Sequence, residues 1–399
     1  MLGDDDALKE DAMAMKMTTW LEAGCGRKKN EHCARLTVLG SALRNSVGWT
    51  IALASLFWIS HAVPASAGGP DNQPAYKVLP PVLRNNLAIF PVVANQSFDT
   101  SQLMTLDEGV RSGQVIVTEA GDERGLVRPG QPIPRRQAGA EVNRLVLYNN
   151  SSHPLLLLAG EIVTGGKQDR VIGSDRIVQA NTGPIDLGVF CVEPGRWVAS
   201  SGKFGSMGAQ MAQPSVRTPA MAEHNQNQVW ANVRASNAKM AGNLSSADAV
   251  TVESTSSYAK VFDSAPVAKM EASYGGQDSE QAILRELHSK GAVGVVVAVN
   301  GQVLWADVFA STELLAKYWP KLMRSYVAEA MTSANSATAP DMHDAQLFMN
   351  NLGGGREIVE TEPNVYRRTD ITGDGFRVFE LMSLLPRTGF IVHITKMRQ

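Results

Sequence analysis

The sequence predicts an α+β fold in which mainly antiparallel β-sheets form a sandwich-like core and helices pack alongside. Two observations carry this prediction. Apolar runs of strand length, separated by turn-forming clusters, follow one another from residue 87 to residue 193 and return after residue 355. Between these two stretches, helical periodicity dominates from about residue 224 to residue 331 and is interrupted by one hairpin pattern.

The first strands are predicted from β-rich runs bounded by turn residues. LAIFPVVA (87–94) and GQVIVTEAG (113–121) are two such runs, and the apolar spacing between them favours one short helix. Residues 122–140, rich in Gly, Pro and Arg, indicate an exposed connection. The next strand segments, with turns at NNSSHP, Gly173 and Asn181–Pro184, are 144–150, 154–163, 169–180 and 185–193.

The second half of the chain is predicted to add helices, a hairpin and further strands. Residues 200–275 favour helical pieces separated by loops, including a helix at 224–240. Two β-rich runs within 293–309 meet at Asn300-Gly301, a pair that tolerates the positive φ of a two-residue hairpin. The remaining predicted elements are a helix over 279–291 that stops at Gly291, a helix from about Pro320, and strands at 356–360, 376–385 and 390–397.

Composition and charge exclude several classes of protein. The 399 residues are 44% hydrophobic and 19% charged, which is normal for a packed globular protein. With a net charge of −2 and no strongly basic segment, we expect no nucleic-acid partner. Of three cysteines, Cys25 and Cys33 precede the globular part, so Cys191 is left either as a buried inert thiol or as a nucleophile.

The N-terminal region has the layout of a secretory signal. Residues 46–60 form an apolar run, Arg35 and Arg44 precede it, and Ala65-Ser66-Ala67 follows. We expect cleavage after Ala67 and export to the periplasm or the exterior; the alternative is an uncleaved anchor, the one expected contact with a membrane. The predicted organisation is therefore an extension at 1–67, a domain at 84–335, and a β-rich continuation of that domain at 336–399.

Four segments stand out along the chain: GEIVTGGKQDRV (160–171), CVEPGRW (191–197), GVVVAVNGQVLWADVF (294–309) and PKLMRSYVAEAM (320–331). In this order they resemble the ARPP-1 family, which is named for an association with ADP-ribosylglycohydrolase and rhodanese-phosphatase proteins. The resemblance implies that the family's defining polar positions fall on Glu161, Lys167, Gln168, Arg170, Glu193, Arg196 and Trp197. It also implies a link to ADP-ribose or to metabolites derived from NAD.

These residue types suit recognition of an anion and acid–base chemistry. Glu161 and Glu193 each end a strand, so they would lie at one edge of a sheet if the two strands are neighbours that run the same way. Lys167 and Arg170, with Gln168 between them, supply donors for phosphate or carboxylate. The alternative is a hairpin turn with solvated charges.

The residues at the end of the predicted strand 185–193 also allow two interpretations, a ligand site and a structural ion pair. Arg196 beside Trp197 suits stacking on a base or holding an anion. Equally, Glu193 and Arg196 suit a structural ion pair. None of the seven histidines has metal-ligand spacing apart from a faint hint at His343, and no known catalytic motif occurs, so we expect no metal and no cofactor.

Two functions remain open at this point, besides an envelope-anchored module that contacts a protein partner through residues 200–275. The first is an exported ligand-binding or structural domain without catalysis. The second is a hydrolase or binding enzyme for an ADP-ribose-like or other phosphorylated small molecule. The expected partner in the second case is an anionic small molecule held by the polar positions between residues 161 and 197.

Overall fold

A computed structural model describes residues 75–120, 143–196, 200–206, 210–333, 338 and 340–399. The predicted signal segment, the connection at 122–140 and Trp197 lie outside these residues. Residues 68–399 form one unit by their internal contacts. Within the described part of the chain, no helix is both long and apolar enough to cross a membrane.

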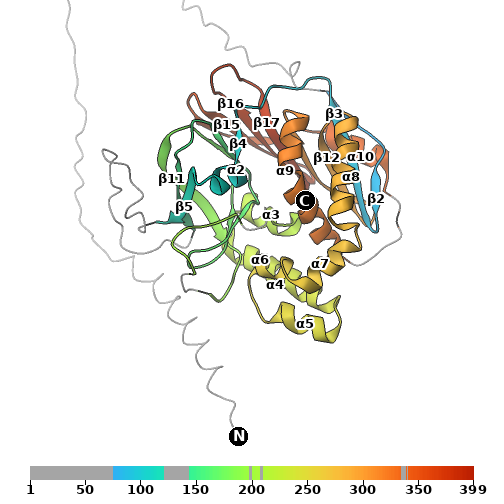
Figure 1. The fold of residues 1–399 in the computed structure, drawn as a ribbon. Helices are drawn as coiled ribbons and strands as arrows, with labels where there is room; N and C mark the ends of the chain where they lie inside the picture. Colours follow the sequence, from blue (N-terminus) through green and yellow to red (C-terminus); the bar gives the residue numbers. More distant parts are fainter. Residues whose placement is uncertain (1–74, 121–142, 197–199, 207–209, 334–337, 339) are drawn as a thin grey trace, which may run out of the picture. The chain divides into compact units, whose positions relative to one another are not determined.

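The largest sheet has nine strands and is antiparallel throughout (Figure 1). Its strand order is β1-β3-β12-β13-β17-β16-β15-β14, and β2 pairs with β3. The hairpin of β12 and β13 therefore lies between strands from the two ends of the sequence, because β12 pairs with β3 and β13 pairs with β17. The strands are β1 (Tyr76–Val78), β2 (Val82–Arg84), β3 (Leu87–Ala94), β12 (Ala292–Val299), β13 (Gln302–Phe309), β14 (Arg356–Glu362), β15 (Tyr366–Gly373), β16 (Phe376–Ser383) and β17 (Ile391–Arg398).

Both faces of this sheet are covered, because side chains alternate between the faces along each strand. On β13, Ala306 and Val308 join one cluster of buried residues, which helix α10 (Met342–Asn350) helps to form. Trp305 and Phe309 point to the other face and join the main core, where helix α9 (Thr312–Met331) packs. The two apolar clusters explain why β12 is buried along its whole length.

Two smaller sheets pack against the main core. One has the order β5-β6-β11-β9-β8 and is antiparallel, and the other has the order β10-β7-β4, with a parallel pair between β4 and β7. Their strands are β4 (Met104–Thr105), β5 (Val115–Glu119), β6 (Arg144–Asn149), β7 (Leu155–Leu157), β8 (Ile162–Val163), β9 (Arg170–Ile172), β10 (Arg176–Val178) and β11 (Thr182–Cys191). The mainly antiparallel α+β class predicted from the sequence is confirmed.

Several helices begin at residues whose side chains cap the first turn. Thr105 and Glu108 form a reciprocal capping box at α2 (Leu106–Arg111), and the Ser311 hydroxyl accepts from the Leu314 amide at 3.0 Å at the start of α9. The other helices are α3 (Pro214–Met221), α4 (Gln226–Gly242), α5 (Ser246–Glu253), α6 (Tyr258–Phe262), α7 (Ala265–Ala272) and α8 (Gly276–Ser289).

Three predictions differ from the structure. The helix expected from about Pro320 begins at Thr312, because the Ser311 cap and the buried Leu314 and Leu315 start it before the proline. The turn expected at Asn181–Pro184 is partly strand, since β11 begins at Thr182 and accommodates Pro184 through a register shift. Strand β15 was missed, because its side chains are mostly polar and it reads as a loop.

Candidate functional site

The glycine-rich loop at residues 165–170 is held from inside the protein by charged residues that follow β11. Arg196 Nη1 donates to the Gly166 carbonyl oxygen at 3.0 Å, and Arg196 Nη2 lies 2.6 Å from Glu193 Oε2. The hydrogen bond to Glu193 raises the pKa of Arg196. The Gln168 side-chain amide donates to the Glu193 carbonyl oxygen at 3.0 Å. The structure thus brings the predicted residues of the loop together with Glu193 and Arg196.

Asp169 fastens the same loop to helix α6. It accepts from the Ser257 hydroxyl at 2.7 Å and from the Gly165 amide at 3.1 Å. Ser257 also caps the N-terminus of α6, so its hydroxyl group connects the loop to the first turn of the helix. Burial and then the neighbouring Glu193 raise the pKa of Asp169 against the lowering effect of Ser257.

Arg170 ends the loop at the start of β9 and is fully buried. Its Nη2 is 3.6 Å from Glu119 Oε1 on β5, while its Nη1 donates to the Gln168 carbonyl oxygen at 2.6 Å. The Lys167 backbone amide donates to Glu119 at 2.9 Å. Burial raises the pKa of the nearby Cys191 thiol to about 11, so this thiol stays protonated at neutral pH and is a poor nucleophile.

Glu161 has a different set of partners. Its Oε1 lies 2.6 Å from Lys321 Nζ on α9, and its Oε2 accepts from the Leu158 amide at 2.7 Å. Lys321 also contacts Asp107 at the start of α2. Burial lowers the pKa of Lys321, but the two carboxylates outweigh burial and raise it. Glu161 therefore ties β8 to two helices and is not bonded to Glu193.

A second buried charge network surrounds Asp307 on β13, and no sequence motif predicted it. Arg217 on α3 binds both carboxylate oxygens at 2.9 and 3.1 Å and stacks over the Trp305 ring at 4.6 Å. The Tyr326 hydroxyl donates to Asp307 at 2.5 Å, and Thr395 donates at 2.9 Å. Burial opposes the charged form, yet Arg217 and then His393 hold the pKa of Asp307 well below its usual range.

His393 connects Asp307 to the smaller sheets. His393 Nδ1 lies 2.6 Å from Asp175 Oδ2, between β9 and β10, and His393 Nε2 lies 3.3 Å from Asp307 Oδ1. Burial lowers the pKa of His393, but the two carboxylates outweigh it and raise the pKa to about 9. The sequence signal for this network was a polar residue, Asp307 or His393, at an inward-facing position of an apolar strand. Periodicity alone predicts an ordinary core position there.

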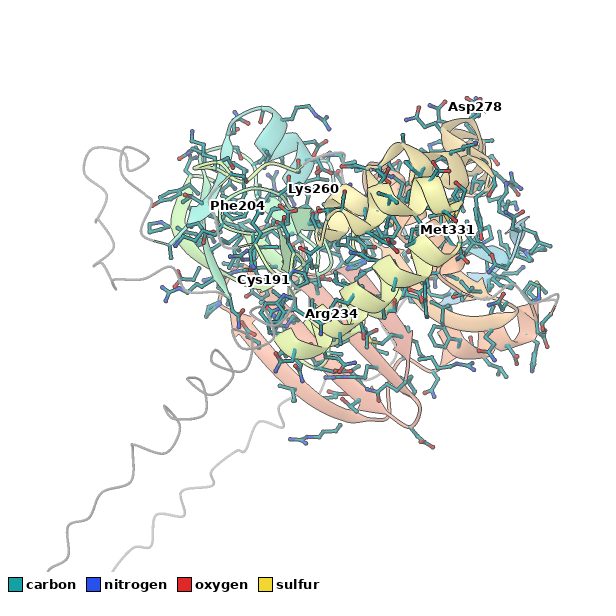
Figure 2. The ribbon with its side chains drawn as sticks, turned by 90° about the horizontal axis from the view of Figure 1, so that it is seen from below. Cys191, Phe204, Arg234, Lys260, Asp278 and Met331 are labelled. Atoms are coloured by element: carbon teal, nitrogen blue, oxygen red, sulfur yellow. The ribbon has the colours of Figure 1, made fainter. Side chains whose placement is uncertain are left out.

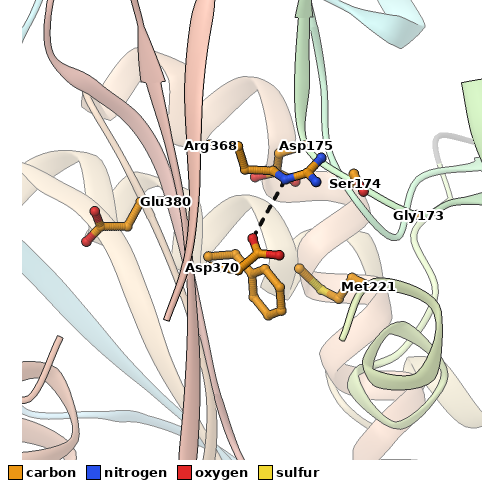
Figure 3. Close-up of a pocket in the computed structure, with 8 residues that line it drawn as sticks. Gly173, Ser174, Asp175, Met221, Arg368, Asp370 and Glu380 are labelled. Atoms are coloured by element: carbon orange, nitrogen blue, oxygen red, sulfur yellow. Dashed lines mark ion pairs between the residues drawn. The ribbon is translucent and has the colours of Figure 1, made fainter. Parts of the chain in front are cut away.

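A small pocket opens beside Asp175. Its lining includes Ser174, Arg368 and Asp370, with Arg368 Nε 3.7 Å from Asp370 Oδ1 (Figure 3). In Figure 3 the Glu380 carboxyl group points away from this pair. The pocket volume of about 10 Å³ is enough for one water molecule but not for a metabolite.

A much larger cleft lies among helices α6, α7, α8 and α9. Its volume of about 910 Å³ falls in the range of small-molecule sites. Figure 1 shows α8 beside α9, with α7 at one end of the pair, and Figure 2 shows Asp278 where α8 begins. The lining residues that carry charge are Asp263, Glu271, Asp278, Glu280 and Arg324, and apolar residues that line it include Phe262, Pro320, Met323 and Val327.

Metal ligation has no support in the part of the chain that the structure describes. No group of three or more His, Cys, Asp or Glu residues there could hold a metal ion. His343, the one sequence hint, lies on the first turn of α10, where its backbone amide donates to Asp341 at 2.8 Å.

Comparison with known proteins gives one family. No curated protein and no solved structure matches the chain. A family model named ARPP-1, described as the ARG and Rhodanese-Phosphatase-superfamily-associated Protein domain, matches residues 75–397. Because this match covers most of the chain and includes both halves of the nine-stranded sheet, the protein belongs to the ARPP-1 family.

Proposed function

We propose that this protein is an exported ARPP-1 domain that binds a small molecule without transforming it, and that the ligand occupies the cleft among α6, α7, α8 and α9. The observation that carries the proposal is the cleft itself, with its volume of about 910 Å³ and its mixed apolar and charged lining. Export is supported by the apolar run at 46–60 and the Ala65-Ser66-Ala67 pattern.

The absence of catalysis is supported by the ion pairs and the burial of the two candidate acid–base groups. Glu161 is bound by Lys321, and Glu193 is bound by Arg196. Both carboxylates are almost completely buried. A general acid or base must reach the proton it transfers, directly or through one water molecule. Neither group lines the large cleft.

The second candidate is a hydrolase or binding enzyme for an ADP-ribose-like compound. It is favoured by the family's association with ADP-ribosylglycohydrolase proteins and by the cationic groups of the 165–170 loop. Its weakness is that Arg170 is buried against Glu119 and that Arg196 holds loop carbonyl groups. An incoming phosphate would have to displace these internal partners.

A binding screen with one blocking variant tests the proposal. Ligand-observed NMR would use a panel of anionic, neutral and cationic small molecules, with ADP-ribose among the anions. Ala272→Trp fills the cleft from its exposed position on α7, and Ala265→Trp is the matched control on the same helix away from the lining.

Saturable binding that persists in Ala265→Trp and disappears in Ala272→Trp supports the cleft as the ligand site. Equal binding of every compound to both variants, or no binding at all, overturns it. Turnover of ADP-ribose, or ADP-ribose binding that is lost in Arg196→Ala, supports the second candidate instead.

A further inference from the structure

The lining of the large cleft has an excess of negative charge. Asp263, Glu271, Asp278 and Glu280 face one cation, Arg324. Arg324 is itself held by α6, because its Nη2 lies 3.3 Å from Asp263 Oδ1 and 3.4 Å from the Phe262 carbonyl oxygen. A phosphorylated ligand would meet repulsion at this surface, and a cation would meet attraction.

A small pocket continues from the floor of the cleft toward the core. The two share Phe262, Glu271 and Arg324, and the deeper pocket adds Gln210 and Tyr258. Gln210 is 5% exposed, and its Nε2 donates to the Ala259 carbonyl oxygen at 3.3 Å. Its Oε1 is left without a hydrogen-bond partner among the described residues.

Glu271 presents a second buried acceptor at the same place. Its Oε1 has no hydrogen bond among the described residues, although Arg324 Nε lies 3.8 Å away. A buried polar group without a partner destabilises the protein, because it has lost its hydrogen bonds to water. The deeper pocket is lined by both acceptors, Gln210 Oε1 and Glu271 Oε1. A ligand group that donates N–H hydrogen bonds would satisfy them.

The titration of the carboxyl groups agrees with this charge excess. Burial raises the pKa of Glu271, Arg324 lowers it, and Asp263 and Glu280 raise it further. Burial also raises the pKa of Glu280 against the effect of Arg324. For both carboxyl groups, burial outweighs the lowering effect that Arg324 has on the pKa.

The rest of the lining suits an organic cation. Phe262, Pro320, Met323 and Val327 form apolar walls for a carbon chain. A metal ion needs several close ligands, and none of the described residues gather in such a group.

We propose that the ligand of this cleft is a small organic cation whose ammonium head, similar in size to the one water molecule that the deeper pocket of about 10 Å³ can hold, donates to Glu271 and Gln210 while its carbon chain lies against Phe262 and Met323. This inference rests on the proposed function, since it names the chemical class of the ligand for the same site. The carboxylates of Asp278 and Glu280 then face the outer part of the ligand and favour a second positive charge.

Agmatine, which carries a guanidinium and an ammonium group on a four-carbon chain, is the probe. Calorimetric titration into the purified protein is expected to show saturable binding that weakens with added salt. Glu271→Gln should weaken binding by about tenfold or more, because it removes the negative charge that faces the cation, and Gln210→Met by about fivefold, because it removes an acceptor of a charged donor. Glu253→Gln, on the exposed end of α5, is the matched control and should leave binding unchanged.

Proton release separates a direct role of Glu271 from a structural one. The cation lowers the pKa of Glu271 on binding, so at a pH near the raised pKa of the free protein the wild type should release protons, seen as heats that vary with the ionisation enthalpy of the buffer. This dependence should shrink in Glu271→Gln. Ala272→Trp, a surface change that leaves the core intact, should abolish agmatine binding.

The outcomes distinguish the two proposals. If agmatine does not bind the wild type, or binds Glu271→Gln and Ala272→Trp as tightly as it binds the wild type, the cation class is overturned. If ADP-ribose or a neutral compound binds in a manner sensitive to Ala272→Trp, the ligand-binding function stands and the cationic ligand does not. If no compound of the panel binds, both fail.

Discussion

Replacement of His393 by Gln should remove a stabilisation that depends on pH in a defined window. His393 is fully buried between Asp175 and Asp307, and these carboxylates raise its pKa from 6.5 to about 9. Each pKa unit corresponds to about 1.4 kcal/mol, so the charged imidazolium contributes roughly 3 kcal/mol to the free energy of unfolding.

The sign follows from the direction of the shift. A histidine whose folded pKa is raised contributes stability that is fully present below its unfolded pKa and is lost as the pH rises through the folded value. The stabilisation should therefore be complete below about pH 6.5 and nearly gone above about pH 9. Other groups titrate in this range, including Lys396, whose pKa burial lowers to about 8. Their contributions cancel in the difference between wild type and variant.

The assay is urea unfolding of the wild type and of His393→Gln at pH 6 and pH 9.5. The difference in unfolding free energy should shrink by about 3 kcal/mol between the two pH values. His288→Gln, on the exposed side of α8, is the control and should show a constant difference. A His393→Gln difference that stays constant within about 0.5 kcal/mol would refute the charged, doubly paired imidazolium.

Three further predictions concern buried groups. Lys321→Met leaves Glu161 without its cation in the core and should lower the unfolding free energy by about 3–5 kcal/mol, measured by urea unfolding. Gly160→Ala places a Cβ atom 2.5 Å from Arg217 Nε at a φ of +96°, so it should lower the melting temperature by several degrees in calorimetry. Glu380→Gln should gain stability relative to the wild type as the pH rises from about 4.5 to 7 in urea unfolding, because burial and then Glu357 raise the pKa of Glu380 to about 7.

Periodicity predicted those elements whose own residues decide their structure. The hairpin at β12 and β13 is one case, because Asn300 and Gly301 adopt the positive φ values of 53° and 78° that its turn requires. Strand β3 is another, since an unbroken apolar run has no alternative to burial. Strand β15 was missed because its stability comes from its neighbours β14 and β16 and not from its own polar side chains.

The candidate site shows a different limit. The structure brings Gln168, Arg170, Glu193 and Arg196 into one network of hydrogen bonds and ion pairs, but charged residues at strand ends look the same in the sequence whether they face a ligand or each other. Which of the two occurs depends on partners far along the chain, such as Glu119 for Arg170. The large cleft left no pattern, because it arises where α7, α8 and α9 pack and its residues have ordinary amphipathic spacing.

Helix α9 links the buried charges to the cleft. On its inner side Lys321 binds Glu161 and Asp107, and Tyr326 binds Asp307. Apolar packing is non-directional and would tolerate a helix displaced along its axis. A displacement of one turn would separate these pairs and leave charges unpaired in the core, at a cost of several kcal/mol. The outer side of the same helix carries Arg324 and supplies one wall of the cleft. The charge pairs that resemble a catalytic site in the sequence therefore fix the position of the wall against which a ligand would bind.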